Sequence, residues 1–121
     1  MSIWRSRPVA EVPEVTLCNW RVMKTDAGDM HFVGIRPDRA TGRVSSVVVE
    51  LDIDARVGVT RSGRRYVLEG PPGPDDEGDA DYVWSGWCQV NRIDAYRDVT
   101  EKVLAGSQVT VAHACQRFSE P

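Results

Sequence analysis

Three carboxylates alternate with other residues in a segment, residues 44–54, whose pattern predicts a strand. Glu50, Asp52 and Asp54 share one face of it, because side chains two residues apart point the same way. Such carboxylates can hold Mg²⁺ or Mn²⁺ for phosphoryl chemistry. A nuclease pattern of Pro-Asp followed by acid-x-Lys is half present, with Pro37-Asp38 before Glu50, but Asp52 occupies the lysine position. We therefore favour a solvated strand face that discourages edge pairing, with a metal-dependent phosphoryl hydrolase as one alternative.

The candidate nucleophiles and bases are three cysteines and two histidines. A thiolate needs a base within hydrogen-bond reach, so catalysis would require Cys18 or Cys115 to meet His31 across a sheet. His113-x-Cys115 offers two soft ligands, but zinc takes three or four and no C-x-x-C pair accompanies them. Together with Cys88, these cysteines are expected to be reduced thiols packed as small hydrophobic residues. We expect no catalytic residue, no metal site and no cofactor.

Arginines dominate the middle of the chain. Residues 36–65 contain seven arginines and four acids, a net charge of +3. Six of the arginines flank a Pro/Gly loop and a Ser-Gly turn: Arg36, Arg39, Arg43, Arg61, Arg64 and Arg65. If both tips lay on one edge, they would form a basic cluster able to bind nucleic-acid phosphates. An isoelectric point near 5.3 argues against that function, and pairing with nearby acids is the simpler interpretation.

The region that follows has the opposite sign. Residues 66–101 contain nine acids and two arginines, a net charge of −7. Five acids gather in and just after a Pro/Gly-rich loop over 70–79: Asp75, Asp76, Glu77, Asp79 and Asp81. Carboxylates spaced in this way can imitate a nucleic-acid backbone and engage a basic groove on a partner protein, with charge steering the encounter. Trp84 and Trp87 would anchor such a contact if exposed, although helical tryptophans more often belong to the core.

Regular elements must position these residues. Hydrophobic periodicity, turn residues and capping signals predict six strands, over 15–25, 30–36, 44–54, 57–61, 64–68 and 109–115. They also predict a helix from about 79 to 91, and a short one that opens at a capping-box-like Asp98-x-x-Glu101 and stops at Gly106. There is no βαβ rhythm, so the expected fold is a single α+β domain over 14–121, with an antiparallel sheet of about five to six strands and two short helices. Residues 1–13 are expected to form an extended arm.

Side-chain alternation assigns faces to the longer elements. In the first strand, one face is predicted to carry Cys18, Trp20 and Val22. In the strand over 44–54, one face is predicted to carry Val47, Val49, Leu51 and Ile53. In the first helix, the buried stripe is predicted to consist of Val83, Trp84, Trp87 and Cys88, with Asp79 or Asp81 as its cap.

Length and composition restrict the class of protein. At 121 residues and 41% hydrophobic content, the chain fits one globular domain. Its longest apolar run, residues 47–49, is far shorter than the ~20 residues of a membrane span. Residues 1–8 contain two arginines but no apolar segment of the kind a secretory signal requires, so we expect a cytoplasmic protein with no membrane partner.

Three segments carry a resemblance: residues 42–46, 60–70 and 79–87. They resemble those of small accessory proteins encoded on plasmids, integrative elements and prophages of GC-rich proteobacteria. The resemblance covers about half of the chain, brings no catalytic motif, and implies a context in which short proteins, including anti-CRISPR and anti-restriction proteins, inhibit host defence by binding. The leading hypothesis is therefore a non-enzymatic protein that binds and inhibits a basic nucleic-acid-handling complex, with a nucleic-acid-binding accessory protein as the second hypothesis.

Overall fold

The computed structural model describes residues 13–106 of the chain. This part contains β1 (Glu14–Thr25), β2 (Met30–Arg36), β3 (Thr41–Val44), β4 (Val48–Asp52), β5 (Val57–Thr60), β6 (Arg65–Leu68), α1 (Asp79–Val90), β7 (Tyr96–Asp98) and α2 (Thr100–Ala105). The strand predicted over 109–115 and almost all of the predicted N-terminal arm lie outside the described residues. Within 13–106, neither helix is long and apolar enough to cross a membrane.

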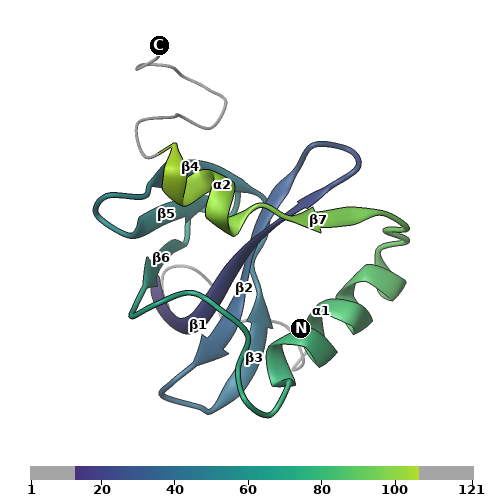
Figure 1. Cartoon of the computed structure of the whole chain (residues 1–121), viewed down its shortest axis with the longest axis horizontal. Coiled ribbons are helices and arrows are strands. Elements are labelled where there is room, and N and C mark those ends of the chain that lie inside the picture. The colour runs from purple at the N-terminus through teal and green to yellow at the C-terminus, as the bar shows by residue number, and fades with distance from the viewer. Residues whose placement is uncertain (1–12, 107–121) are drawn as a thin grey trace.

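The strands form one open, mostly antiparallel sheet (Figure 1). Its order is β3-β2-β1-β6-β5-β4, and β7 pairs with the C-terminal end of β1. The α+β class and the single domain are confirmed, but the sheet is larger than predicted and contains a parallel pair, β1 with β6. The short strands β3 and β7 were not predicted as strands, because four and three residues carry too little periodic pattern.

A bulge interrupts β1 between the part that pairs with β6 and most of the part that pairs with β2. Asn19 has a left-handed φ of 47°, and the register with β2 shifts between Cys18 and Arg21. Leu17 and Trp20 therefore both face the main core, although residues three apart lie on opposite faces of a regular strand. The predicted face of Cys18 was wrong for this reason: Cys18 is half-buried and lies outside the core that contains Trp20.

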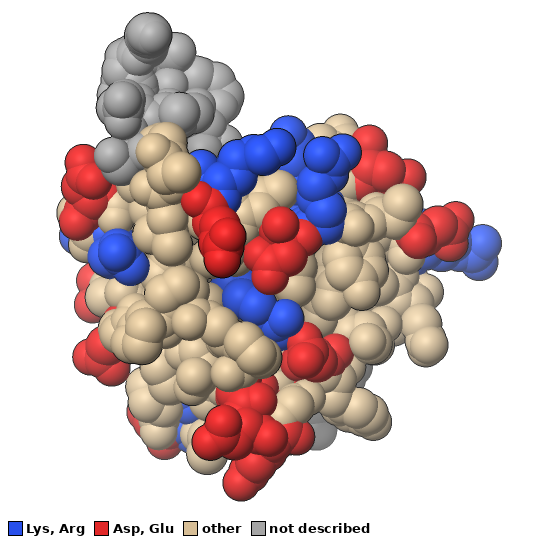
Figure 2. All heavy atoms as spheres, viewed as in Figure 1, with Lys and Arg blue, Asp and Glu red and all other residues tan. Residues whose placement is uncertain are grey.

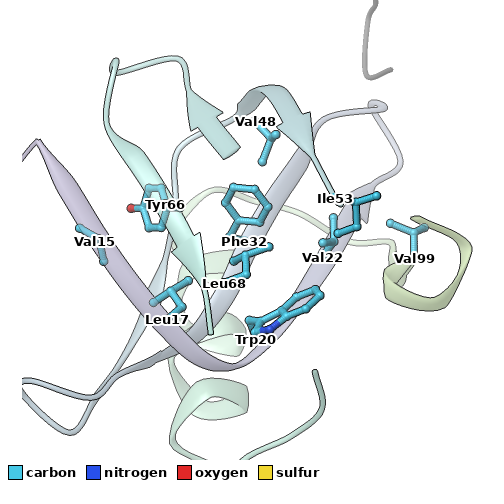
Figure 3. Close-up of a cluster of buried hydrophobic side chains, with 10 residues drawn as sticks. All are labelled: Val15, Leu17, Trp20, Val22, Phe32, Val48, Ile53, Tyr66, Leu68 and Val99. Atoms are coloured by element: carbon cyan, nitrogen blue, oxygen red, sulfur yellow. The ribbon is translucent and has the colours of Figure 1, made fainter. Parts of the chain in front are cut away.

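The main core lies on one face of the sheet. Its buried side chains come chiefly from β1, β2, β4 and β6 and meet around Phe32 (Figure 3). Val103 and Leu104 of α2 pack against this cluster. The start of α2 is close to the prediction, because the carboxylate of Asp98 accepts a hydrogen bond from the backbone N–H of Thr100 at 2.9 Å.

The predicted faces of the strand over 44–54 were wrong in part. Val48 is buried in the main core, whereas Val49 is 39% exposed. The register of β4 with β5 shifts between Val48 and Glu50, so an irregularity again interrupts the two-residue alternation. Ile53 is buried as predicted, but it lies beyond the end of β4.

The helix α1 packs on the opposite face of the sheet, against β2 and β3. Ala80, Trp84 and Cys88 form its buried stripe and contact Met23 and Val33. Trp84 and Cys88 were predicted in this stripe, and the other predicted members, residues 83 and 87, are half-buried. The sheet thus separates two hydrophobic clusters, one closed by α2 and one by α1.

Candidate functional site

The loop before α1 is anchored to the bulge of β1. The Trp20 side-chain N–H donates to the carbonyl of Gly70 at 3.0 Å, and the backbone N–H of Gly73 donates to the carbonyl of Trp20 at 3.1 Å. The Asn19 side-chain amide donates to the carbonyl of Pro74 at 3.5 Å. The irregular loop predicted over 70–79 is present, and its first half is tied to the sheet immediately before the acidic residues.

Gly78 occupies the N-cap position of α1, and the side chain of Asp75 accepts hydrogen bonds from the first N–H groups of the helix. Its two carboxylate oxygens accept hydrogen bonds from the backbone N–H groups of Asp79, at 2.9 Å, and Ala80, at 3.1 Å. Gly78 reaches the helix with a φ of 75°, so the chain turns sharply between the carboxylate and the helix. The prediction that Asp79 or Asp81 caps the helix was wrong, because the loop folds back and places an earlier acid over the free N–H groups.

Asp75 titrates abnormally because of this arrangement. Desolvation opposes ionisation, but the N–H donors of Ala80 and Asp79 outweigh it and lower the pKa of Asp75. A carboxyl group whose pKa is lower in the folded state than in the unfolded state contributes fully to stability at pH values above its unfolded-state pKa. This contribution is lost as the pH falls through the folded-state pKa.

Replacing Asp75 with alanine is therefore expected to lower the free energy of unfolding by about 1 kcal/mol at neutral pH. The difference from the wild type should shrink on acidification below the ordinary aspartate pKa, about 3.9, because the wild-type carboxylate then becomes protonated. Urea denaturation at a series of pH values measures it. A difference that does not change between neutral and acidic pH would contradict the assigned cap.

Asp81 is exposed but forms an ion pair within the chain. Its carboxylate pairs with the guanidinium of Arg21 on β1, which lies 60 positions away in sequence. The Nε atom of Arg21 is buried and has no hydrogen-bond partner within the described chain, so Asp81 is the anion that compensates this partly buried cation. The ion pair between Arg21 and Asp81 therefore links α1 to β1.

The other three predicted acids face solvent. Asp76, Glu77 and Asp79 are exposed, and their side chains form no hydrogen bond or ion pair within residues 13–106. We call these three residues the acidic patch. In Figure 2, acidic side chains gather at the lower edge of the view. Acidic and basic side chains alternate over much of the remaining visible face. Opposite charges are thus mixed over most of this view, with local concentrations of acid.

Of the two tryptophans of α1, Trp84 is buried and Trp87 is half-buried. Trp84 is buried and stacks on Trp87 with ring centroids 5.2 Å apart and an interplanar angle of 12°. The ring of Trp87 in turn lies 4.5 Å from that of His31. The exposed large side chains of α1 are instead Tyr82, at 81%, and Val90, at 82%. Their exposure could have been predicted from the sequence, because neither residue belongs to the helical stripe formed by residues 80, 84 and 88.

Several of the predicted arginines have partners within the protein. Arg36 pairs with Asp38 at 3.0 Å, and the pKa of Asp38 is lowered chiefly by this hydrogen bond. Arg65 pairs with Glu14 at 3.2 Å. The Nε of Arg43 donates to the hydroxyl of a buried tyrosine at 2.9 Å. Arg64 is buried, whereas Arg39 and Arg61 are exposed.

The two arginine-bearing tips do not meet at one edge. Arg36 lies opposite Thr41 in the antiparallel pair of β2 and β3, next to the turn that joins these two strands. The turn between β5 and β6 instead contacts the segment after β3, where the backbone N–H of Arg61 donates to the carbonyl of Val47 at 2.7 Å. The tips thus lie toward opposite ends of β3, which separates the predicted basic cluster into two groups.

Cys18 and His31 do not form the thiol–imidazole pair that catalysis would require. Cys18 lies opposite Ile35, whereas His31 lies opposite Met23, five residues further along β1. The Nδ1 atom of His31 lies 2.9 Å from the carbonyl of Ser45, so it carries the proton and donates to that oxygen. Burial raises the pKa of the Cys88 thiol, which disfavours the thiolate. Cys115 and His113 lie outside the described residues.

The three strand carboxylates are placed near solvent. Glu50 and Asp52 lie on β4 and are exposed, as is Asp54 in the turn that follows. The Asp52 carboxylate accepts a hydrogen bond from the backbone N–H of Ala55 at 3.1 Å, which stabilises this turn. Within residues 13–106, no three His, Cys, Asp or Glu side chains lie close enough together to hold a metal ion.

The chain was also compared with known proteins. It matches no protein-family model, and comparison with curated proteins and with solved structures gives no significant match.

Proposed function

We propose that this protein is a non-enzymatic interaction protein that engages a basic surface of a partner protein through the acidic patch. The observation that carries the proposal is that Asp76, Glu77 and Asp79 are exposed and are neutralised by no cation within the described chain. Uncompensated charges of this kind attract a basic surface over roughly a Debye length, about 8 Å at physiological ionic strength.

The anchoring of the patch supports the same function. Hydrogen bonds from Asn19 and Trp20 hold the first half of the loop, and Asp75 holds the first turn of α1. The acidic patch lies between these two attachments. A loop backbone that is already held in place loses less conformational freedom on binding, so less of the interaction free energy is lost to ordering it.

The resemblance to accessory proteins of mobile elements gives the proposed partner. We propose that it is a nucleic-acid-handling defence complex of the CRISPR or restriction type, acting in the cytoplasm, and that the acidic patch occupies its basic groove in place of nucleic acid. The carboxylates would then take the positions of backbone phosphates, and inhibition would follow from competition rather than from catalysis.

The test mixes the purified protein with Cascade-type CRISPR complexes of several subtypes and measures binding of target DNA. We expect DNA binding to fall with at least one subtype. Replacing Asp76 with asparagine and Glu77 with glutamine should weaken inhibition at least about tenfold, because close charge pairs across an interface contribute about 1.5 kcal/mol or more.

The matched control changes Asp26 to asparagine and Glu50 to glutamine. Both residues are exposed elsewhere and form no ion pair within residues 13–106, so the change in net charge is the same. This variant should inhibit like the wild type. Unchanged DNA binding with every subtype would refute the proposed partner, and equal loss in both variants would show that net charge acts rather than the acidic patch.

Two alternatives stay predictions. Binding of nucleic acid would use the six predicted arginines, of which Arg39 and Arg61 are exposed, and it predicts an affinity that falls steeply with salt. A flat mobility-shift titration at low salt would reject it. A phosphoryl hydrolase that uses Glu50, Asp52 and Asp54 predicts an activity that a chelator abolishes, but within residues 13–106 these carboxylates do not lie close enough together to hold a metal ion.

A further inference from the structure

The side of α1 that points away from the sheet carries two exposed hydrophobic side chains with a glycine between them. Tyr82, Gly86 and Val90 are four residues apart and share one side of the helix, and Asp79 lies on the same side. Tyr82 and Val90 are more than four-fifths exposed, whereas Gly86 between them has no side chain. A groove runs along this face and is lined in part by Ser85 and Gln89. We call Asp79, Tyr82, Gly86 and Val90 the outer face.

The fold does not explain the glycine at position 86. A Cβ atom built there meets no other atom within 4 Å, and the backbone is not in the left-handed region. Glycine inside a helix is also less stable than alanine, so it weakens α1 without relieving any contact. The absence of a side chain instead opens a notch between two exposed hydrophobic side chains, into which the backbone of another helix can come close.

The outer face is complementary to itself. If two copies of α1 cross in antiparallel orientation at Gly86, residues at equal distances on either side of the crossing face each other. Tyr82 of one copy then lies beside Val90 of the second copy, and the reverse contact repeats it by two-fold symmetry. Two exposed hydrophobic side chains on each copy are covered in this way, and the notches allow the helix axes to approach.

Charge supports the same orientation. Asp79 is the first residue of α1 and Arg92 lies two residues beyond its end, so antiparallel crossing brings the end of α1 that carries Asp79 in one copy near the end that is followed by Arg92 in the second copy. Both are exposed and form no ion pair within residues 13–106. α1 itself contains no Lys or Arg, so a parallel crossing would instead place the acidic ends together.

We propose that the protein forms a two-fold symmetric dimer through the outer face of α1, with the helices antiparallel and crossing at Gly86. The contact is one short helix from each copy, at the low end of interface sizes, so the dimer dissociates on dilution. Asp76 and Glu77 precede the helix and stay outside the contact. The dimer therefore leaves Asp76 and Glu77 of each copy exposed, whereas Asp79 of the acidic patch takes part in the contact, and the existence of the dimer does not depend on the proposed function.

The test is sedimentation of the purified full-length chain over a concentration series from about 5 µM to about 1 mM, the range in which weak contacts dissociate. The wild type should shift from monomer to dimer mass within this range. Replacing Gly86 with glutamine, which fills the notch with a good helix former, should raise the dissociation constant at least about tenfold. Ala105→Gln places the same side chain at an exposed position of α2, away from the outer face, and is the matched control, with little change expected.

A charge exchange tests the orientation. Asp79→Arg and Arg92→Asp should each weaken the dimer, and the two together should restore it, with circular dichroism checking that each variant keeps its helix content. A monomer mass at every concentration would overturn the proposal, as would a dimer that Gly86→Gln does not weaken. A dimer that loses affinity with Gly86→Gln but is not restored by the double exchange would overturn the antiparallel arrangement.

Discussion

Replacing Trp20 with alanine is expected to lower the free energy of unfolding by about 3–5 kcal/mol, a large part of the stability of a domain of this size. The indole is fully buried in the main core and is one of its largest side chains. The guanidinium of Arg56 lies over it, 5.4 Å from the ring centroid. The surrounding strands cannot collapse into so large a space without breaking their own pairing, so most of the cavity would persist.

The same variant should release the loop that precedes the acidic patch. The indole N–H of Trp20 holds the carbonyl of Gly70, and without it two attachments remain near the bulge. Urea denaturation followed by circular dichroism measures the loss of stability, and hydrogen exchange of the amides over 70–79 measures release of the loop. Trp20→Phe is the control: it keeps most of the apolar volume and removes the donor, so the loop should exchange faster with a smaller loss of stability.

A loss of less than about 1 kcal/mol in Trp20→Ala would contradict the assigned core, because it would mean that the ring contributes like a surface residue. Unchanged exchange over 70–79 in both variants would show that the backbone bond from Gly73 and the Asn19 side chain hold the loop alone.

Elements with a local signal were predictable from the sequence. The hairpin of β5 and β6 follows from alternating residues around Ser62-Gly63, and α1 follows from Trp84 and Cys88 at helical spacing. The bulges were not predictable, because a left-handed Asn19 leaves no mark on the alternation until the partner strands are known. The parallel pairing of β1 with β6 joins segments about 50 residues apart, and no local pattern encodes it.

The candidate site shows the same division between local and distant information. The composition of residues 70–81 correctly places acids in a loop and at a helix start. Their separate roles depend on distant or folded-back partners: Asp75 on N–H groups presented by the turn at Gly78, and Asp81 on Arg21. Only after these two are assigned does the acidic patch emerge as the exposed remainder. Charge counting alone overestimates the acids that are free to bind.

Replacing Gly58 with alanine is expected to lower the free energy of unfolding by about 1–3 kcal/mol, although the change adds a single methyl group. An ideal Cβ at this position would lie 2.3 Å from one ring carbon of Phe32 and 2.6 Å from another. Gly58 lies in β5 and its φ is not left-handed, so the glycine is required by space rather than by backbone conformation. Phe32 is fully buried at the centre of the main core and packs against the ring of Tyr66, so it cannot move away freely.

A double-mutant cycle separates this steric cause from a general loss of strand stability. Phe32→Leu alone should destabilise the domain by leaving a cavity, but combined with Gly58→Ala it should cost at least about 0.5 kcal/mol less than the sum of the single changes, because the smaller side chain vacates the space that the methyl group needs. Gly86→Ala is the matched control, since its Cβ meets no atom within 4 Å, and it should leave stability unchanged or raise it. Additive losses in the cycle would mean that the ring and the glycine do not compete for the same space, and the close packing of β5 on Phe32 would then be wrong.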